Sequence, residues 1–346
     1  MKIAHTLAVF LFLIGSQAFA VSELNYAQEM RERVLPFYAL GTPGSFEGAK
    51  GVTIQFRKWE RADERGALVF LAGRGDPFET YAETLYDFFQ AGYSVYTMDH
   101  RGQGASDRLV ADQQMGYVDR FSRYVEDVKS FLTRVVNAKP HAKRYLVAHS
   151  MGGAISALYL TKHQGDFDAA SLVTPMIKIN TGRYNTLQAE IIARAKKGEQ
   201  YAPGKGPFDP TETFKADNSL TSSQVRFDEF MRVFRENPRL QLGGASIRWV
   251  RESFTAGYLM RFHAPRATTP MLILTAGLDT IVENEQQAEF CGRAPHCVQV
   301  RAEACGQSPK CIEAPLYGES KHMILAERDA IREDAVRRIT GFFSLF

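Results

Sequence analysis

One serine lies at the junction between an apolar, strand-like run and a helical pattern. Ser150 lies in the sequence Ala-His-Ser-Met-Gly, after an apolar run at 145–147 and before a helical pattern at 151–163. This order of strand, sharp turn and helix is typical of the G-x-S-x-G nucleophile elbow, which holds a serine hydroxyl clear of the sheet. Ala148 replaces the first glycine of the motif, and Gly152 retains the second. The pattern predicts a nucleophilic serine; the alternative is an ordinary strand-to-helix turn with a surface serine.

An acid and a base follow this serine in the order that α/β-hydrolases use, which is Ser, then Asp or Glu, then His. Asp279 follows an apolar strand-like run, and His322 lies in a loop after the last such run. We therefore expect Asp279 to orient His322, and His322 to act as the general base. Glu283 is the alternative acid, and a turn is the alternative role for Asp279. The other histidine in this part, His296, lies between two close cysteines, which disfavours it as the base.

The loop after the apolar run at 67–73 is placed to complete an oxyanion hole. Such a hole needs two backbone N–H groups directed at the oxygen on which negative charge develops. We expect one N–H from Met151, the residue after the nucleophile. The other is expected from Arg74, in the sequence Leu-Ala-Gly-Arg-Gly-Asp. The alternative for Gly73 and Gly75 is a plain turn.

The composition is that of an ordinary globular protein. The chain has 346 residues, 45% of them hydrophobic, and a formal net charge of +3. A small, dispersed charge argues against nucleic acid as the partner. Acyl transfer by serine, histidine and aspartate needs no metal and no organic cofactor, so none is expected.

Alternating patterns place these motifs in an α/β fold, a mostly parallel sheet flanked by helices. Residues 21–48 are expected to be an amphipathic lead-in. Residues 176–265 contain no buried-strand pattern and are too long for a simple connection, so they are predicted to be a mainly helical cap. The predicted core is 21–175 and 266–346. Strands are expected at 51–60, 67–73, 93–99, 145–150, 169–175, 271–277, 297–302 and 311–316, and helices at 80–93, 117–137, 151–163, 185–197, 222–236, 246–262, 283–291 and from 326.

Residues 1–20 have the features of a signal peptide. Lys2 gives a positively charged start, an apolar run covers 7–14, and Ala-Phe-Ala at 18–20 matches an A-x-A cleavage site. Cleavage after Ala20 is expected to leave a periplasmic or secreted protein.

The four cysteines agree with an exported chain, because an even number of cysteines in such a chain indicates disulfide bonds. Zinc is the alternative, but the chain has no paired C-x-x-C, and His296 alone lies near the cysteines. Three pairings are open, and the local one is favoured. It joins Cys291 to Cys297 and Cys305 to Cys311.

Other conspicuous residues favour structural roles. His149, beside the nucleophile, is interpreted as structural, and the loop that follows the strand at 93–99 is interpreted as a turn. No G-x-G-x-x-G or G-x-x-x-x-G-K-[ST] motif is present. The residues of that turn are Asp99, Arg101, Gly102 and Gly104.

Six aromatic residues of the insertion are predicted to form a small core, and part of this set could also line an acyl chain. They are Phe227, Phe230, Phe234, Trp249, Phe254 and Tyr258.

Five segments resemble one bacterial family. They are YLVAHSMGGAI, MDHRGQGASDRL, GRGDPFETYAETLYDFFQAGY, GGASIRWVRES and HMILAERDAIRED. These segments resemble the lysophospholipase L2 family, within the monoacylglycerol lipase-like group of α/β-hydrolases. The similarity runs from roughly residue 30 to the C-terminus. Ala148 fits the elbow of this family, and Arg74 fits its Gly-Arg, where monoacylglycerol lipases have His-Gly.

The resemblance implies an α/β-hydrolase fold with a mainly helical cap inserted after the sixth strand. It also implies a serine hydrolase that releases fatty acid from lysophospholipids, with transfer of the acyl group to another lipid as a further reaction. A lipid substrate and peripheral membrane contact are the implied partners. The signal peptide and the four cysteines depart from the family and leave the substrate open. The alternatives are a monoacylglycerol lipase, a general carboxylesterase and an inactive lipid-binding protein.

Overall fold

The structure is a computed structural model. The expected signal peptide at 1–20 and most of the helix expected at 185–197 lie outside the residues that it describes. Within the described part of the chain, no helix is both long and apolar enough to cross a membrane. The described residues are 21–182, 188, 191 and 198–346.

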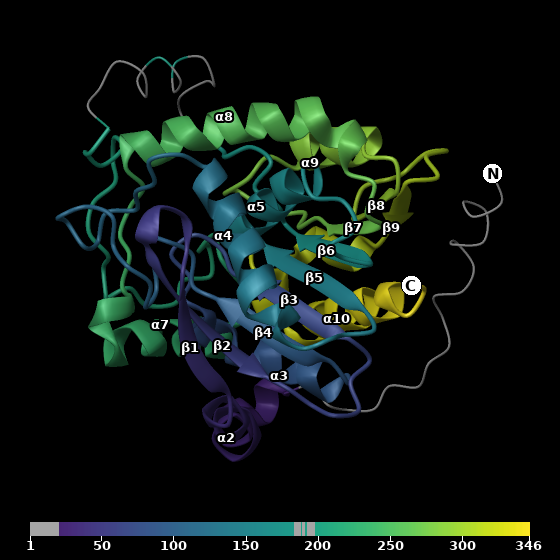
Figure 1. Ribbon diagram of the computed structural model, residues 1–346, viewed down its shortest axis with the longest axis horizontal. Helices are drawn as coiled ribbons and strands as arrows, with labels where there is room; N and C mark the ends of the chain where they lie inside the picture. The colour runs from purple at the N-terminus through teal and green to yellow at the C-terminus, as the bar shows by residue number, and fades with distance from the viewer. Residues whose placement is uncertain (1–20, 183–187, 189–190, 192–197) are drawn as a thin grey trace.

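A nine-stranded sheet forms the centre of the molecule (Figure 1). Its strands are β1 (Thr42–Glu47), β2 (Thr53–Trp59), β3 (Ala67–Leu71), β4 (Ser94–Met98), β5 (Arg144–His149), β6 (Ala169–Val173), β7 (Met271–Leu274), β8 (Cys297–Arg301) and β9 (Cys311–Glu313). They are ordered β1-β2-β4-β3-β5-β6-β7-β8-β9. The pairs that involve β2 are antiparallel, and the other pairs are parallel. The carboxyl ends of β3, β5, β6, β7 and β8 therefore meet at one edge of the sheet.

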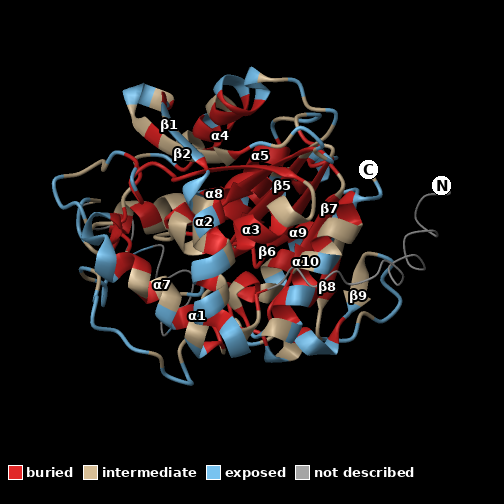
Figure 2. Ribbon diagram, turned by 90° about the horizontal axis from the view of Figure 1, so that it is seen from below, coloured by how far each residue is buried: buried red, intermediate tan, exposed pale blue. Residues whose placement is uncertain are grey.

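Helices cover both faces of this sheet (Figure 1). They are α1 (Tyr26–Glu29), α2 (Leu35–Ala39), α3 (Ala82–Gln90), α4 (Ser122–Arg134), α5 (Met151–Leu160), α7 (Gln224–Glu236), α8 (Ile247–His263), α9 (Asn284–Arg293) and α10 (Asp329–Phe343). One apolar core lies between the sheet and α4, α5, α8 and α9, and a second lies between the sheet and α1, α2, α3 and α10. Figure 2 shows the buried sheet enclosed by these layers.

The central strand β3 shows why a continuous apolar run forms a sheet covered on both faces. Ala67, Val69 and Leu71 pack in the first core, whereas Leu68 and Phe70 pack in the second. Successive side chains of a strand point to opposite faces, so both sets must be apolar when helices cover both faces.

The first strand is the main departure from the sequence prediction. Residues 42–47 form β1, antiparallel to β2, where we expected only a lead-in. Pro43, Gly44 and Ser45 have low strand propensity, so the local pattern gives no signal. Pairing with β2 at the sheet edge, where proline is tolerated, provides the order instead.

The insertion (residues 176–265) follows β6 and carries α7 and α8, close to the helices expected there. Only part of the aromatic set forms the small core that the sequence predicts. Phe230 packs against Phe234, with their ring centroids 5.0 Å apart, but Trp249 packs in the core beside α5. Tyr258 is 60% exposed on α8.

Buried polar contacts fasten the insertion to the rest of the protein. The Arg226 guanidinium on α7, whose side chain is 1% exposed, lies 3.0 Å from Glu83 on α3 and 2.8 Å from Asp329 on α10. Lys321 donates to the Ala216 carbonyl at 2.7 Å. Because these partners come from separate elements, the insertion is held at several points.

The cysteines lie at disulfide distance in the local pairing that the sequence favours. Cys291 pairs with Cys297, their Cα atoms 5.2 Å apart, and joins the end of α9 to the start of β8. Cys305 pairs with Cys311, with Cα atoms 5.5 Å apart, in a loop that is mostly exposed.

Removing the two disulfides is expected to have unequal effects on stability. Each closes a loop of the same length, worth about 2 kcal/mol in chain entropy. Cys291 and Cys297 are 2% and 1% exposed, so the variant with both replaced by alanine should lose at least that much unfolding free energy in a urea titration. The matched Cys305→Ala/Cys311→Ala variant should lose less, since its loop can open without the core. Equal losses, or the reverse order, would contradict this assignment.

Candidate active site

The turn between β5 and α5 is a strained corner with Ser150 at its tip. Ser150 has φ 51° and ψ −113°, a conformation that non-glycine residues rarely adopt. A Cβ on Gly152 would lie 2.4 Å from the Leu71 carbonyl oxygen, and one on Gly153 would lie 2.8 Å from Pro175 Cα. The two glycines are therefore required by the close approach of β3 and of the chain after β6.

Three of the predicted residues form a hydrogen-bonded line. His322 Nε2 lies 2.8 Å from Ser150 Oγ, and His322 Nδ1 lies 2.7 Å from Asp279 Oδ2. Asp279 Oδ1 accepts from the backbone N–H groups of Ile281 and Val282 at 2.8 and 3.1 Å. The side chains of Asp279 and His322 are 0% and 4% exposed. This arrangement fixes the carboxylate and leaves one of its oxygens for the imidazole.

The alternative acid and base lie elsewhere. Glu283 pairs with Lys178 at 2.7 Å. His296 is exposed immediately before β8, at the amino end of a parallel strand, so it lies at the sheet edge opposite Ser150. Among the described residues, no group of three or more His, Cys, Asp and Glu side chains is arranged to hold a metal ion.

The two candidate oxyanion donors flank this corner. Met151 is the first residue of α5, so its N–H has no acceptor within the helix. Arg74 follows β3, which is the neighbour of β5 in the sheet, with Leu71 paired to Ala148. The loop that contains Arg74 therefore begins beside the corner that contains Ser150.

A buried glutamine that the sequence analysis did not single out braces the Arg74 loop. Gln103, 2% exposed, donates through Nε2 to the Gly73 carbonyl at 2.8 Å and accepts at Oε1 from the Gly75 N–H at 3.1 Å. These bonds fix the peptides on both sides of Arg74. The sequence signal that could have identified Gln103 was its place in the glycine-punctuated loop after β4. Because β4 is the other neighbour of β3, that loop lies beside the loop that contains Arg74.

His149 also has a positioning role. Its Nε2 lies 3.2 Å from the His322 carbonyl oxygen, which accepts in addition from Thr174 Oγ1 at 2.9 Å. Its Nδ1 lies 2.7 Å from the Tyr81 hydroxyl, which is 2.9 Å from Asp76 Oδ2. Burial lowers the pKa of His149, so the ring is neutral, and Nε2 carries its proton because a carbonyl can only accept.

The loop after β4 has the turn role that the sequence predicts. Asp99 accepts from the N–H groups of Phe78 and Ala105 at 2.9 and 2.8 Å, and burial raises its pKa to about 7. Arg101 forms a buried ion pair with Asp127 at 2.6 Å. The loop glycines have positive φ, with Gly102 at 79° and Gly104 at 56°.

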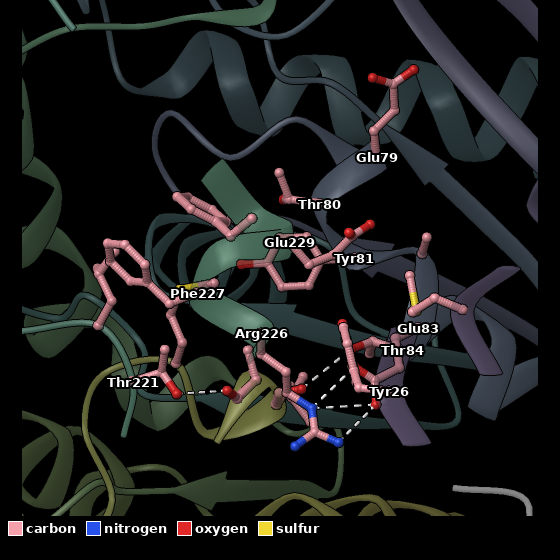
Figure 3. Close-up of a pocket in the computed structure, with 17 residues that line it drawn as sticks. Tyr26, Glu79, Thr80, Tyr81, Glu83, Thr84, Thr221, Arg226, Phe227 and Glu229 are labelled. Atoms are coloured by element: carbon pink, nitrogen blue, oxygen red, sulfur yellow. Dashed lines mark hydrogen bonds and ion pairs between the residues drawn. The ribbon is translucent and has the colours of Figure 1, made fainter. Parts of the chain in front are cut away.

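A pocket adjoins the site without including the three residues of the hydrogen-bonded line (Figure 3). It is a small hollow that is partly open to solvent. Its wall includes Arg226, Glu83 and Phe227. It also includes Tyr81, whose hydroxyl contacts His149, and Met323, which follows His322 in the chain. Ser150 itself is 7% exposed. The pocket therefore lies beside the site and does not contain Ser150, which is buried.

Comparison with known proteins gives one family and several relatives. The family model described as serine aminopeptidase S33 matches residues 62–329. Lysophospholipase L2 of Escherichia coli (strain K12) is 34% identical over 317 residues, covering 89% of this chain and 89% of that protein. The monoacylglycerol lipase of Mycolicibacterium smegmatis is 27% identical, covering 69% of this chain and 79% of that protein.

Solved structures share the architecture at low sequence identity. A soluble variant of monoglyceride lipase from Saccharomyces cerevisiae superposes with a TM-score of 0.65 at 16% identity, covering 88% of this chain and 95% of the other. A thermostable carboxyl esterase from Bacillus coagulans gives 0.66 at 15% identity, covering 88% and 98%. Together with the sheet order, these similarities confirm the predicted α/β-hydrolase fold.

Proposed function

The chain belongs to the serine aminopeptidase S33 family of α/β-hydrolases as a relative of lysophospholipase L2, and we propose that it hydrolyses the fatty-acyl ester of lysophospholipids. The observation that carries this proposal is the hydrogen-bonded line from Ser150 through His322 to Asp279. The proposed roles are nucleophile, general base and orienting acid. Met151 and Arg74 supply the oxyanion donors through their backbone N–H groups.

The proposed reaction proceeds through an acyl-enzyme. Ser150 Oγ attacks the ester carbonyl carbon while His322 Nε2 takes the hydroxyl proton. Asp279 stabilises the imidazolium that forms, and the two N–H groups bind the oxyanion. His322 then protonates the departing glycerophospho-alcohol, which leaves the acyl group on Ser150. Water attacks this ester, gives its proton to His322, and releases the fatty acid as Ser150 recovers its own proton.

The insertion is proposed to act as a cap over this site. Its fastening by Arg226 and Lys321, and the low exposure of Ser150, support an enclosed site. Exclusion of water strengthens the electrostatic interactions that such a site uses.

An exported location is also part of the proposal. The cysteine pairs suit an oxidising compartment. Cleavage after Ala20 would make Val21 the first residue of the mature protein. Mass measurement of the protein isolated from the periplasm or medium tests this start.

The substrate proposal rests on the greater similarity to lysophospholipase L2 than to the monoacylglycerol lipase. The test is turnover by the mature protein of lysophosphatidylcholine, monoolein, a short p-nitrophenyl ester and an aminoacyl p-nitroanilide. We expect the highest kcat/KM for lysophosphatidylcholine and none for the anilide. Preference for monoolein would favour a monoacylglycerol lipase, and preference for the short ester a general carboxylesterase. Failure on every substrate would favour an inactive lipid-binding protein.

A further inference from the structure

The side chain of Arg74 is a partly buried cation without an acidic ion-pair partner. Its Nη2 donates to the Gly243 carbonyl at 2.6 Å, and its guanidinium carbon lies 5.2 Å from the centre of the Trp249 ring. No carboxylate forms an ion pair with Arg74 among the described residues, although the charge of Asp76 acts on it, and its Nε has no hydrogen-bond partner there. Burial lowers the pKa of Arg74. A buried polar atom ordinarily requires a hydrogen-bond partner, so the Nε of this guanidinium is under-satisfied.

A second donor beside it is also poorly satisfied. Trp249 is 4% exposed, and its indole Nε1 makes no hydrogen bond of good geometry in the described structure, although the Tyr124 hydroxyl interacts with it. Indole N–H can only donate, and buried donors are nearly always paired. The nearest acid along the chain, Asp76, faces Tyr81 and His149 instead. Two under-satisfied donors on adjacent side chains point to a ligand that carries several acceptor oxygens.

The position of Arg74 identifies which part of a ligand would meet these donors. Its backbone N–H is the proposed partner of the substrate oxyanion, while its guanidinium lies at the far end of the same side chain. In a lysophospholipid acylated on the first glycerol carbon, the same number of bonds separates the ester carbonyl carbon from the phosphorus as separates the arginine backbone nitrogen from its guanidinium carbon.

We propose that the Arg74 guanidinium, with the Trp249 indole N–H, binds the phosphate of the lysophospholipid whose ester lies at Ser150. A guanidinium presents paired N–H groups that match phosphate oxygens. This inference rests on the proposed ester hydrolysis at Ser150. It makes Arg74 a specificity residue, because a monoacylglycerol has no anion to satisfy the guanidinium.

The test is a substrate ratio measured on the full mature protein. In the Arg74→Met variant the backbone N–H and an unbranched apolar stem are retained, and the guanidinium is removed. The ratio of kcat/KM for 1-palmitoyl lysophosphatidylcholine to that for 1-monopalmitoylglycerol should fall ~30-fold, the effect expected from one lost charge-assisted hydrogen-bonding group. Trp249→Phe, which keeps a ring and removes the N–H, should lower the same ratio by a smaller factor of ~5.

Arg108→Met is the matched control. Arg108 also holds the insertion, donating to the Arg239 carbonyl at 2.9 Å, but it is not a proposed substrate contact. The ratio should stay unchanged in this variant. An equal loss on both substrates in Arg74→Met would overturn the proposal, since it would mean that Arg74 acts only by fastening Gly243. An unchanged rate on both would overturn it as well.

Inhibition separates lipid phosphate from free phosphate. Glycerophosphocholine should inhibit the wild-type protein competitively and inhibit Arg74→Met at least ~10-fold more weakly, whereas inorganic phosphate at the same concentration should compete less well. Equal inhibition of both proteins by glycerophosphocholine would overturn the phosphate contact. Turnover of a short p-nitrophenyl ester reports separately on the Ser150 chemistry. If that turnover is absent from the wild-type protein, the proposed function itself has failed.

Discussion

Replacing Ser150 by alanine is expected to lower kcat/KM by ~10⁶-fold, to the background left by binding and the oxyanion hole. The expected loss is this large because, among the described residues, Ser150 supplies the hydroxyl that is hydrogen-bonded to His322 Nε2. The measurement is release of fatty acid from lysophosphatidylcholine, with the thermal unfolding of each variant recorded to show that the fold is retained.

Ser156→Ala is the matched control for this variant. Ser156 lies on α5, is buried, and has a hydroxyl without a hydrogen-bond partner in the described structure. Removal of this hydroxyl should leave turnover within about twofold of wild type, because no hydrogen bond is lost with it. Wild-type turnover in Ser150→Ala would exclude Ser150 as the nucleophile.

Replacing Asp279 by asparagine should lower kcat by ~10⁴-fold with little change in KM. Asp279 Oδ1 accepts from the N–H groups of Ile281 and Val282, so the oxygen of an asparagine will stay there. The amide nitrogen will then face His322 Nδ1 and donate to it. That contact forces the imidazole proton onto Nε2, where it faces Ser150 and cannot accept the hydroxyl proton.

Glu283→Gln tests the competing acid. Glu283 pairs with Lys178 and makes no hydrogen bond to His322 in the described structure, so its variant should stay within ~3-fold of wild-type kcat. A large loss in Glu283→Gln with a small loss in Asp279→Asn would reverse the assignment of the acid.

The parts of the fold that the sequence predicted are those specified by local pattern. Continuous apolar runs such as the one in β3 predict buried parallel strands, and the helices α7 and α8 follow their expected bounds within two residues. The strand β1 was missed because Pro43 and Gly44 carry no strand signal, and its order comes from pairing with β2. Tyr258 was misplaced because a periodic aromatic pattern does not reveal which face of a helix meets the core.

In the candidate site, too, some residues could be predicted from the sequence and others could not. The elbow motif selected Ser150, chain order then selected Asp279 and His322, and the structure brings their side chains within hydrogen-bonding distance. The supporting contacts could not be predicted so well. Gln103 braces the Arg74 loop, and His149 contacts the His322 carbonyl, through tertiary pairings that no local motif encodes.

The most direct test of the central claim is covalent labelling of the folded protein with a fluorophosphonate, followed by mass analysis of its peptides. The account predicts one label per chain on Ser150, slowed by lysophosphatidylcholine and abolished in Ser150→Ala. It also predicts much slower labelling in His322→Ala, because the general base is removed. Absence of labelling in the folded wild-type protein, or labelling at a different residue, would contradict the assignment of Ser150 as the nucleophile.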